Sequence, residues 1–329
     1  MKQILNRLFN HQSLTKNEAH EIMIKMGAGE YNPSQIAAFI SVYLMRSIEL
    51  EEIIGFREAL LSMATKIDLS NFETIDIVGT GGDGKNTFNI STAACCVVAG
   101  AGYFVAKHGN YGATSVSGSS NVLEYYGAKF STDQAVLNKT LEQCGFTYLH
   151  APYFNPAMKN VAPIRKELGV RTFFNILGPL INPSQPQYQC LGVYDLKMMR
   201  LYNYIYQNLG VKYSIVHSLD GYDEISLTDN SKIVNNNGEY LLSPKQLGFE
   251  KNEHSDLWGG ESVKDAAKIF LDVLEGKSTE AQSNAVIINA AIAIQTRCPL
   301  KSISDCIEEA KESIKSGNAL LSFKKFINQ

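Results

Sequence analysis

The chain has 329 residues, an apolar share of 45% and a formal net charge of −3. This length favours about two domains, and the composition is ordinary for a globular chain with a full core, which excludes a disordered protein. The charge gives no global basic field, so we expect neither nucleic acid nor an anionic membrane surface as a partner.

Cysteine usage and the N-terminus indicate a soluble, cytoplasmic protein. The six cysteines are scattered without CxxC pairs, which argues against a zinc site and against a disulfide framework. The N-terminal stretch soon turns polar and lacks the apolar core of a signal peptide. The most continuous apolar run, residues 93–102, is about half as long as a membrane span.

A capping box marks the first clear helix of a region, residues 1–70, that we predict to be helical throughout. Thr15 is followed three residues later by Glu18, so each side chain can bond the other residue's main-chain N–H. The apolar residues that follow repeat at helical spacing before Gly27: Ala19, Ile22, Met23 and Met26.

Two further helices complete a predicted small bundle. Asn32 is the expected N-cap of the second, with Pro33 in its first turn. The apolar face of the second helix comprises Ile36, Phe39, Ile40, Tyr43 and Leu44. The third apolar set comprises Ile53, Ile54, Leu60 and Leu61. Because this bundle has no polar cluster of its own, it is typical of a packing or oligomerisation module.

From residue 74 onward, short apolar runs alternate with amphipathic stretches, which predicts an α/β domain with a mostly parallel sheet flanked by helices. The expected strands are residues 74–78, 103–106, 146–151, 189–194 and 213–217. The clearest expected helices are residues 131–145 and 196–210. Residues 231–244 are predicted to form an antiparallel hairpin that turns at Asn236 to Gly238.

The segment between Asn155 and Pro183 is helical in pattern and longer than a crossover between strands needs. We therefore expect it to pack with the N-terminal helices. The predicted helical domain is then residues 1–70 joined by about 156–182. The α/β domain is residues 72–155 and 183–329, and it is expected to carry the ligand site.

The glycine-rich stretch DIVGTGGDGKNTFNIST, residues 76–92, allows three interpretations. Gly79, Gly81 and Gly84 match the dinucleotide pattern G-x-G-x-x-G, but Lys107 and His108 stand where that site needs an acidic residue. A Walker A loop is also nearly matched. However, Asn86 occupies the position of its magnesium-binding hydroxyl, and the carboxylate of Asp83 would be repelled by a triphosphate.

The third interpretation, a pyrophosphate cradle, uses every residue of the stretch. Amides of a glycine turn can surround a pyrophosphate, and the start of the following helix favours negative charge. Thr87, Asn89, Ser91 and Thr92 would add donors there, while Asp83 would accept from a ligand hydroxyl or orient the loop. A tight turn without a ligand would explain the glycines but not the polar residues beside them.

A second polar glycine-rich loop, residues 107–121, follows the neighbouring strand. Loops at the carboxyl ends of parallel strands form the ligand crevice, so the two loops are expected to face each other. Lys107 would supply a point charge, and Ser115, Ser117 and Ser119 would supply donors. A lysine or histidine in such a loop can also be an ordinary solvated residue.

Three more charged residues are candidates. Asp223 and Glu224 follow a predicted strand directly, and adjacent desolvated carboxylates call for a cation such as Mg²⁺, although adjacent acids are also common on surface loops. Arg165 could clamp a planar carboxylate, or could pair with Glu167 on a solvated face.

Taken together, GTGGDG, TFNIST, KHGN, NPAM, RKELGVRTFFNILGPLINP, DGYDE and the late NAA resemble the anthranilate phosphoribosyltransferase family. The resemblance runs in order along almost the whole chain. It implies a helical N-terminal domain that mediates a homodimer, and an α/β domain like that of pyrimidine nucleoside phosphorylases. It also implies the reaction, in which the amine of anthranilate displaces pyrophosphate from phosphoribosyl pyrophosphate (PRPP).

The resemblance also implies site residues at matching positions. Those implied for PRPP are Gly79, Gly82, Asp83, Thr87, Asn89, Ile90, Ser91, Thr92, Lys107, His108, Gly109, Asn110, Ser115 and Ser119. Those implied for Mg²⁺, expected as two ions per subunit, are Ser91, Asp223 and Glu224. Those implied for anthranilate are Gly79, Asn110 and Arg165.

The expected chemistry needs leaving-group stabilisation, by Lys107 among others, more than a general base, because an aromatic amine is already a neutral nucleophile. We therefore assign no proton transfer to His108.

Two positions depart from the family pattern. The family usually has arginine where this chain has Tyr111, and histidine where this chain has Asn155. The alternatives are a nucleoside phosphorylase, which needs no dicarboxylate metal site, a transferase for another aromatic amine, and a nucleic-acid-binding relative, which should be basic.

Overall fold

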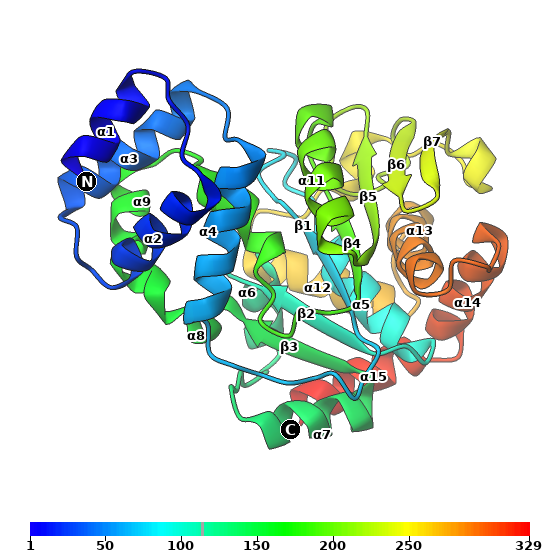
Figure 1. The fold of residues 1–329 in the computed structure, drawn as a ribbon. Coiled ribbons are helices and arrows are strands. Elements are labelled where there is room, and N and C mark those ends of the chain that lie inside the picture. The colour runs from blue at the N-terminus through cyan, green and yellow to red at the C-terminus, as the bar shows by residue number, and fades with distance from the viewer. Residues whose placement is uncertain (113–114) are drawn as a thin grey trace. The chain divides into compact units, whose positions relative to one another are not determined.

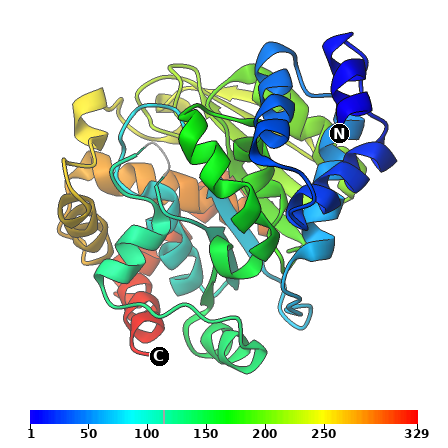
Figure 2. The same ribbon diagram turned by 90° about the vertical axis from the view of Figure 1, so that its left-hand side faces the viewer.

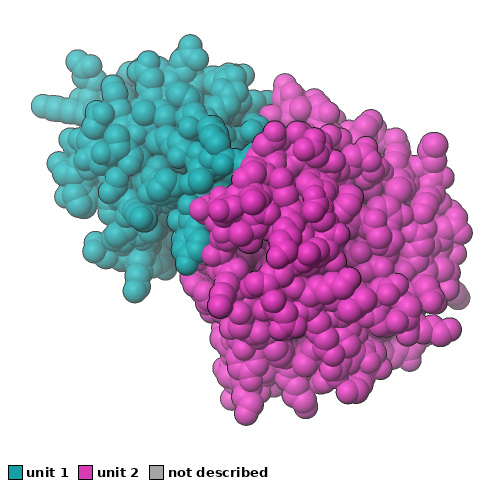
Figure 3. Space-filling view, turned by 90° about the horizontal axis from the view of Figure 1, so that it is seen from below, with its two compact units in different colours: residues 1–67, 151–185 teal, residues 68–150, 186–329 magenta. Residues whose placement is uncertain are grey.

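The computed structural model describes residues 1–112 and 115–329. The chain forms two compact units, coloured separately in Figure 3. The helical unit comprises Met1–Ile67 and Ala151–Gln185, and the α/β unit comprises Asp68–His150 and Pro186–Gln329. Each unit is therefore discontinuous in sequence.

Helices make up the first unit, as the capping signals predicted. Its elements are α1 (Lys2–Phe9), α2 (Lys16–Gly27), α3 (Pro33–Met45), α4 (Leu50–Met63), α8 (Ala151–Phe154), α9 (Ala162–Leu168), α10 (Phe173–Leu177) and the 3₁₀ turns η1 (Pro156–Asn160) and η2 (Gly178–Leu180). The capping box of Thr15 and Glu18 and the N-cap at Asn32 are confirmed. The placement of Leu44 on the buried face was wrong, because 46% of this residue is exposed at the margin of that face.

An aromatic cluster joins the later segment of the helical unit to its first helices. Phe173 of α10 lies 5.0 Å from Phe56 of α4 and 4.9 Å from Tyr43 of α3, measured between ring centroids. Phe39 and Phe56 meet edge to face at 6.0 Å. Aromatic rings bury large apolar areas, so this cluster makes a major contribution to the core of the unit.

A buried carboxylate ties three parts of the helical unit together. Glu52 of α4 is fully buried and accepts hydrogen bonds from the Arg46 guanidinium, the Tyr43 hydroxyl and the N–H groups of Leu14 and Glu49. A buried charge with this many partners is costly to leave unpaired. Glu52 therefore fixes the linkers before α2 and α4 relative to α3.

One seven-stranded sheet organises the α/β unit, in the order β3-β2-β1-β4-β5-β6-β7 (Figure 1). The strands are β1 (Ile75–Gly79), β2 (Val105–Gly109), β3 (Phe146–His150), β4 (Tyr188–Gly192), β5 (Lys212–Ser218), β6 (Ser231–Asn235) and β7 (Gly238–Leu242). The first five pair in parallel, and the predicted antiparallel hairpin is confirmed as β6 and β7. The strand order reverses between β1 and β4, where ligand crevices form in such sheets.

Helices cover this sheet. They are α5 (Ile90–Gly100), α6 (Ser119–Tyr125), α7 (Gln134–Cys144), α11 (Leu196–Leu209), α12 (Val263–Leu274), α13 (Glu280–Arg297), α14 (Ile303–Lys315) and α15 (Asn318–Ile327), with the 3₁₀ turns η3 (Lys245–Leu247) and η4 (His254–Leu257). The nearly wholly buried α5 and α13 pack on each other and on the central strands, and α15 lies beside α7 (Figures 1 and 2). Within the described ranges, no helix is long and apolar enough to cross a membrane.

Candidate active site

The turn between β1 and α5 has a backbone conformation that requires glycine. Gly81, Gly82 and Gly84 have φ values of 62°, 77° and 74°, in the left-handed region that other residues rarely adopt. A Cβ on Gly81 or Gly84 would meet nothing within 4 Å, so conformation and not crowding selects glycine there. The sequence thus builds a tight turn that a bound anion can approach closely, while the N–H groups of Thr80, Gly81 and Lys85 donate to other groups of the protein.

Crowding explains two other glycines, which allow Asp223 to reach this turn. A Cβ on Gly79 would lie 2.3 Å from Oδ2 of Asp223, and one on Gly192 would lie 1.5 Å from the Asp223 carbonyl oxygen. The N–H of Gly81 donates a 2.6 Å hydrogen bond to Oδ2 of Asp223. The carboxylate therefore sits against the ends of β1 and β4, at the point where the strand order reverses.

Three carboxylates gather at this position. One oxygen each from Asp83, Asp223 and Glu224 lies within 4.8 Å of the others, and the Ser91 hydroxyl donates to Oε1 of Glu224 over 3.2 Å. Burial, and then the charge of Asp83, raise the pKa of Asp223 to about 6. Burial, and then the charge of Asp223, raise the pKa of Glu224 well above its usual range. The cluster thus favours a bound positive charge.

These residues fit a magnesium ion. Oε2 of Glu224 is buried and has no hydrogen-bond partner in the described part of the chain. Mg²⁺ is a hard cation that takes one or two carboxylates together with substrate phosphate oxygens. Asp83, for which the sequence predicts a contact with PRPP or a role in orienting the loop, lies close enough to Asp223 and Glu224 to belong to the same cluster.

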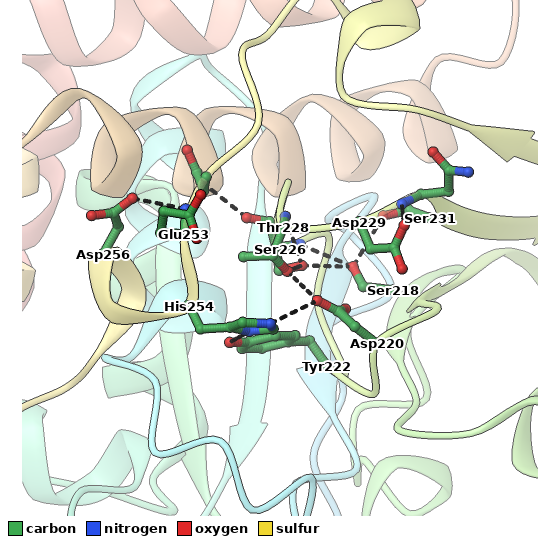
Figure 4. Close-up of polar contacts among 12 residues, drawn as sticks. Ser218, Asp220, Tyr222, Ser226, Thr228, Asp229, Ser231, Glu253, His254 and Asp256 are labelled. Carbon is green, nitrogen blue, oxygen red and sulfur yellow. Dashed lines mark hydrogen bonds and ion pairs between the residues drawn. The ribbon is translucent and has the colours of Figure 1, made fainter.

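A network of hydroxyl groups holds the loop that carries Asp223 and Glu224 (Figure 4). It runs from Asp220 through Thr228 and Ser226 to Ser218, with successive oxygen distances of 2.5, 2.6 and 3.0 Å. The Ser218 hydroxyl donates to the carbonyl of Glu224 over 2.8 Å. This network therefore fixes the loop between β5 and β6.

Two rings and a lysine flank the same loop. Figure 4 shows the ring of His254 over Tyr222, and their Nδ1 and hydroxyl atoms are 2.7 Å apart. The ammonium of Lys85, from the glycine turn, lies 4.8 Å from the centroid of the Tyr222 ring. A cation at this distance from a tyrosine face is attracted to it, so Lys85 fastens the glycine turn to the acid loop.

The second predicted loop begins inside the sheet. The expected strand at residues 103–106 was placed too early, since β2 spans Val105–Gly109 and contains Lys107 and His108. Lys107 is only 3% exposed and donates a 2.5 Å hydrogen bond to the carbonyl of Ile77. His108 is buried, and its main-chain N–H donates to Asp76 over 3.2 Å. Parallel pairing with Tyr148 and Leu149 of β3 keeps these two residues in the strand, which strand propensity alone did not indicate.

Hydroxyl groups tie the rest of this loop to the sheet. The hydroxyl of Tyr148 on β3 lies 2.7 Å from the hydroxyls of both Ser119 and Ser120, and Ser120 lies 2.9 Å from Nδ1 of His150. A Cβ on Gly109 would come within 2.4 Å of Ser119 and of Tyr148, so this close approach requires glycine. The main-chain carbonyl of Asn110 accepts from Ser119 over 3.3 Å.

The remaining PRPP candidates have varied surroundings. Asn89 is the N-cap residue of α5 and donates to the carbonyl of Ser117 over 3.1 Å, which joins the two loops. The side chains of Ile90 and Thr92 are buried in the core, so only their main-chain groups can face a ligand. Thr87 forms a β-bridge with Trp258, and Ser115 is exposed.

Tyr111 and Asn155, the two residues that depart from the family pattern, both make contacts with neighbouring residues. Tyr111 donates to Glu124 over 2.7 Å and meets the His150 ring edge to face at 5.1 Å. Asn155, in the helical unit, is 5% exposed and donates to the carbonyl of Ala151 over 3.3 Å. Each side chain therefore has a local structural function in place of the expected arginine or histidine.

Arg165 lies in α9 of the helical unit and keeps spare donor capacity. Its guanidinium donates to Asn175 over 3.3 Å and lies 5.1 Å from the centroid of the Phe174 ring. Its Nε is buried without a hydrogen-bond partner, and among the described residues no acid pairs with it, Glu167 included. Burial lowers the pKa of Arg165. This environment suits an added carboxylate better than a solvated surface.

Sequence reasoning missed three residues at the site. Gly192 gave no signal, because its role depends on a contact with Asp223 that no local pattern encodes. Lys85 was considered only as part of a nucleotide loop. Asn289 stood in the NAA motif without a role, although an asparagine inside an apolar helix was a usable signal.

Two family models match the chain. The glycosyl transferase family, helical bundle domain, matches residues 2–64, and the glycosyl transferase family, a/b domain, matches residues 71–320. The anthranilate phosphoribosyltransferase of Bacteroides thetaiotaomicron is 58% identical over 327 residues, which cover 99% of this chain and 98% of that protein. That of Flavobacterium psychrophilum is 55% identical over 325 residues, covering 99% and 98%.

Solved structures agree with these relatives. The anthranilate phosphoribosyltransferase of Thermus thermophilus has a TM-score of 0.91 at 32% identity, covering 98% of both chains. The Saccharomyces cerevisiae enzyme in complex with PRPP and Mg has a TM-score of 0.90 at 28% identity, covering 98% of this chain and 96% of that one. The motifs, the fold and these similarities agree, and the chain belongs to the anthranilate phosphoribosyltransferase family.

Proposed function

We propose that this protein transfers the phosphoribosyl group of PRPP to the amine of anthranilate and releases pyrophosphate. The proposal rests above all on the cluster of Asp83, Asp223 and Glu224 beside the glycine turn. A nucleoside phosphorylase, which binds inorganic phosphate, has no need of three clustered carboxylates, two of them buried, at this place. The proposal is also supported by the 58% identity of this chain to a bacterial anthranilate phosphoribosyltransferase.

The glycine turn and the second loop would hold PRPP. N–H groups of the turn and of the first turn of α5 can donate hydrogen bonds to the departing pyrophosphate and stabilise the negative charge that develops on it, helped by the helix dipole. Lys107 adds a positive charge on the neighbouring strand, and Ser119 and Asn110 offer hydrogen bonds. The other PRPP contacts in this proposal are Gly79, Gly82, Asp83, Thr87, Asn89, Ile90, Ser91, Thr92, His108, Gly109 and Ser115.

We assign Ser91, Asp223 and Glu224, joined by Asp83, to magnesium, with two ions per subunit. When bound, Mg²⁺ neutralises charge that develops on the departing pyrophosphate. The acids themselves hold the cation at the turn, because burial and mutual repulsion make an uncompensated negative charge on them unfavourable. A yeast family member has been solved with PRPP and Mg, which supports this assignment.

Anthranilate would contact Gly79, Asn110 and Arg165. The half-buried guanidinium of Arg165 can pair with the acceptor carboxylate, and a yeast family member has been solved with 4-fluoroanthranilate. The amine needs no strong general base, because it is neutral and nucleophilic near pH 7. Positioning and leaving-group stabilisation then supply most of the acceleration.

We propose further that the protein is a cytoplasmic homodimer that pairs through its helical unit. Phe9, Leu44 and Met45 expose 59%, 46% and 89% of their surface on α1 and α3, where a second copy could cover them. All six cysteines are free thiols, as is usual in a reducing compartment. Sedimentation of the wild type and of a Phe9→Ser/Met45→Ser variant tests the pairing: an unchanged dimer in the variant would refute this face.

The direct test combines purified protein, PRPP, Mg²⁺ and anthranilate. We expect loss of anthranilate fluorescence with stoichiometric release of pyrophosphate. Turnover with another aromatic amine but none with anthranilate would reassign the acceptor and leave the PRPP site intact. Phosphorolysis of a pyrimidine nucleoside, without PRPP turnover, would instead favour the nucleoside phosphorylase.

Removal of the two acids tests the metal site. Asp223→Asn combined with Glu224→Gln keeps the shape of both side chains but removes their charge. We expect the Mg²⁺ concentration for half-maximal activity to rise at least about tenfold, because each lost carboxylate removes a charged ligand. Unchanged magnesium dependence in this double variant would refute the assignment of both acids.

A further inference from the structure

Asn289 is a buried polar residue in the middle of an apolar helix. It is 5% exposed, and its neighbours Ala285, Ile288 and Ala290 are fully buried. Asparagine is a poor residue for a helix interior, and a buried amide without partners is strongly unfavourable. Its presence at this point of α13 therefore needs a specific cause.

The cause is visible in its hydrogen bonds to Ile225, the residue that directly follows Glu224. The Asn289 Oδ1 atom accepts from the N–H of Ile225 over 3.1 Å, and Nδ2 donates to the carbonyl of Ile225 over 2.9 Å. Nδ2 also donates to the carbonyl of Ala285 over 2.7 Å, which fixes the orientation of the amide on its own helix. One side chain thus binds both main-chain groups of one residue, as a neighbouring strand would.

Other contacts hold neighbouring parts of the same loop. The carbonyl of Glu224 accepts from Ser218, and the carbonyl of Asp223 lies against Gly192. Leu227 has a φ of 62°, a strained value for leucine that persists only where surrounding contacts fix it. The peptide after Glu224 is held by Asn289 from one side and by Ser218 from the other.

We infer that Asn289 is a positioning residue for the metal-binding acids. It holds the main chain of Ile225, and thereby Glu224 and Asp223, at the place where they meet Asp83 and the glycine turn. Magnesium demands near-ideal octahedral geometry, so a small displacement of these carboxylates weakens its binding. The inference rests on the proposed function, and it assigns a role to the late NAA motif.

The test compares two variants with a matched control on the same helix. Asn289→Ala removes all three hydrogen bonds of the side chain. Asn289→Asp retains the bond from the Ile225 N–H but turns a carboxylate towards two carbonyls. Thr296→Val removes another buried polar group of α13, a hydroxyl that lies 2.7 Å from both the Ser214 hydroxyl and the Ile292 carbonyl. Among the described residues, no hydrogen bond joins Thr296 to the acid loop.

Metal binding is measured directly, by electron paramagnetic resonance of free Mn²⁺ during titration of each protein with PRPP present and anthranilate absent. A protein-free titration supplies the blank, and circular dichroism checks the fold. We expect binding weaker by about 10- to 100-fold in both Asn289 variants, as is typical for residues that orient metal ligands, and within twofold of wild type in Thr296→Val. The Michaelis constant for anthranilate at saturating Mg²⁺ should change less than twofold.

The Asp223→Asn/Glu224→Gln variant separates two kinds of failure. If it loses Mn²⁺ binding while a folded Asn289→Ala or Asn289→Asp protein binds as tightly as wild type, the inference about Asn289 is wrong and the metal site stands. If the double variant itself binds Mn²⁺ normally, the assignment of Asp223 and Glu224 to the metal is wrong, and the inference about Asn289 is wrong with it. Equal weakening in Thr296→Val and the Asn289 variants would reduce Asn289 to a general stabilising residue and overturn its positioning role.

Discussion

A single methyl group on Gly192 should displace the metal-binding acids. In Gly192→Ala, the new Cβ would lie 1.5 Å from the carbonyl oxygen of Asp223 and 2.6 Å from its carbonyl carbon. Real Cβ contacts are essentially never shorter than 3.0 Å, so these atoms must separate by at least about 1.5 Å. Strand β4 cannot give way easily, because Gly192 pairs with Gly79 on one side and Val216 on the other. The loop that carries Asp223 must therefore move.

The displacement sets the expected magnitude. A misplacement of about 1 Å at a reacting centre can reduce activity about 100-fold, which corresponds to about 2.7 kcal/mol of transition-state stabilisation. We therefore expect kcat/KM of Gly192→Ala to fall at least about 100-fold, with a raised Mg²⁺ requirement. The assay is anthranilate fluorescence at several Mg²⁺ concentrations, with thermal unfolding followed by circular dichroism.

Cys190→Ala is the matched control for this experiment. It lies two residues earlier on β4 and is 4% exposed. Loss of its sulfur should lower the free energy of unfolding by about 1 kcal/mol and leave kcat/KM almost unchanged. A Gly192→Ala protein with the activity and Mg²⁺ dependence of wild type would show that the acid loop is not held against β4, and the reasoning would fail.

Three more substitutions test other parts of the molecule. Arg165→Ala should raise the Michaelis constant for anthranilate at least about tenfold in steady-state assays, because it removes a charge-assisted clamp on the carboxylate, and the Michaelis constant for PRPP should change less than twofold. A change confined to the Michaelis constant for PRPP would mean that Arg165 binds PRPP and not anthranilate. Tyr148→Phe should raise the Michaelis constant for PRPP about tenfold, since Ser119 loses its 2.7 Å partner, and an unchanged constant would contradict this. Glu52→Gln should lower the free energy of unfolding in urea by about 3 kcal/mol, because Arg46 loses its buried partner. Burial raises the pKa of Glu52, but the bonds from Arg46 and two main-chain N–H groups outweigh burial and leave this pKa below its usual value of 4.5. The stabilisation is therefore present above about pH 4.5 and lost as the pH falls through the lowered pKa, so the variant should show a flatter acid limb in stability against pH.

Local rules account for the parts of the fold that could be predicted from the sequence. The capping box at Thr15, the N-cap at Asn32 and the hairpin turn before Gly238 each depend on a few neighbouring residues, and each is confirmed. The glycine turn belongs to the same class, because the positive φ values of Gly81, Gly82 and Gly84 need glycine whatever lies nearby. Such features are determined by the residues that form them and by their immediate neighbours in the sequence.

Errors arose where neighbours distant in sequence decide the outcome. Lys107 lies inside β2 because pairing with the adjacent strands continues past the apolar residues that defined the expected strand. Leu44 is exposed because helical spacing identifies a face but not where that face ends. Both depend on packing partners that a single segment does not contain.

The residues of the candidate site also fall into two groups, those that local sequence reveals and those that only distant contacts reveal. The groups that would touch a ligand or an ion, such as the glycine turn, Asp223 and Glu224, are recognisable from local composition. The groups that place them are not, since Asn289 binds Ile225 from 64 positions away and Gly192 acts only through the space it leaves for Asp223. An asparagine among the apolar residues of α13 nevertheless signals a distant main-chain partner, because burial without one would be too unfavourable. A polar residue inside an apolar helix is thus a reason to look for a loop that it holds, and here that loop carries the acids.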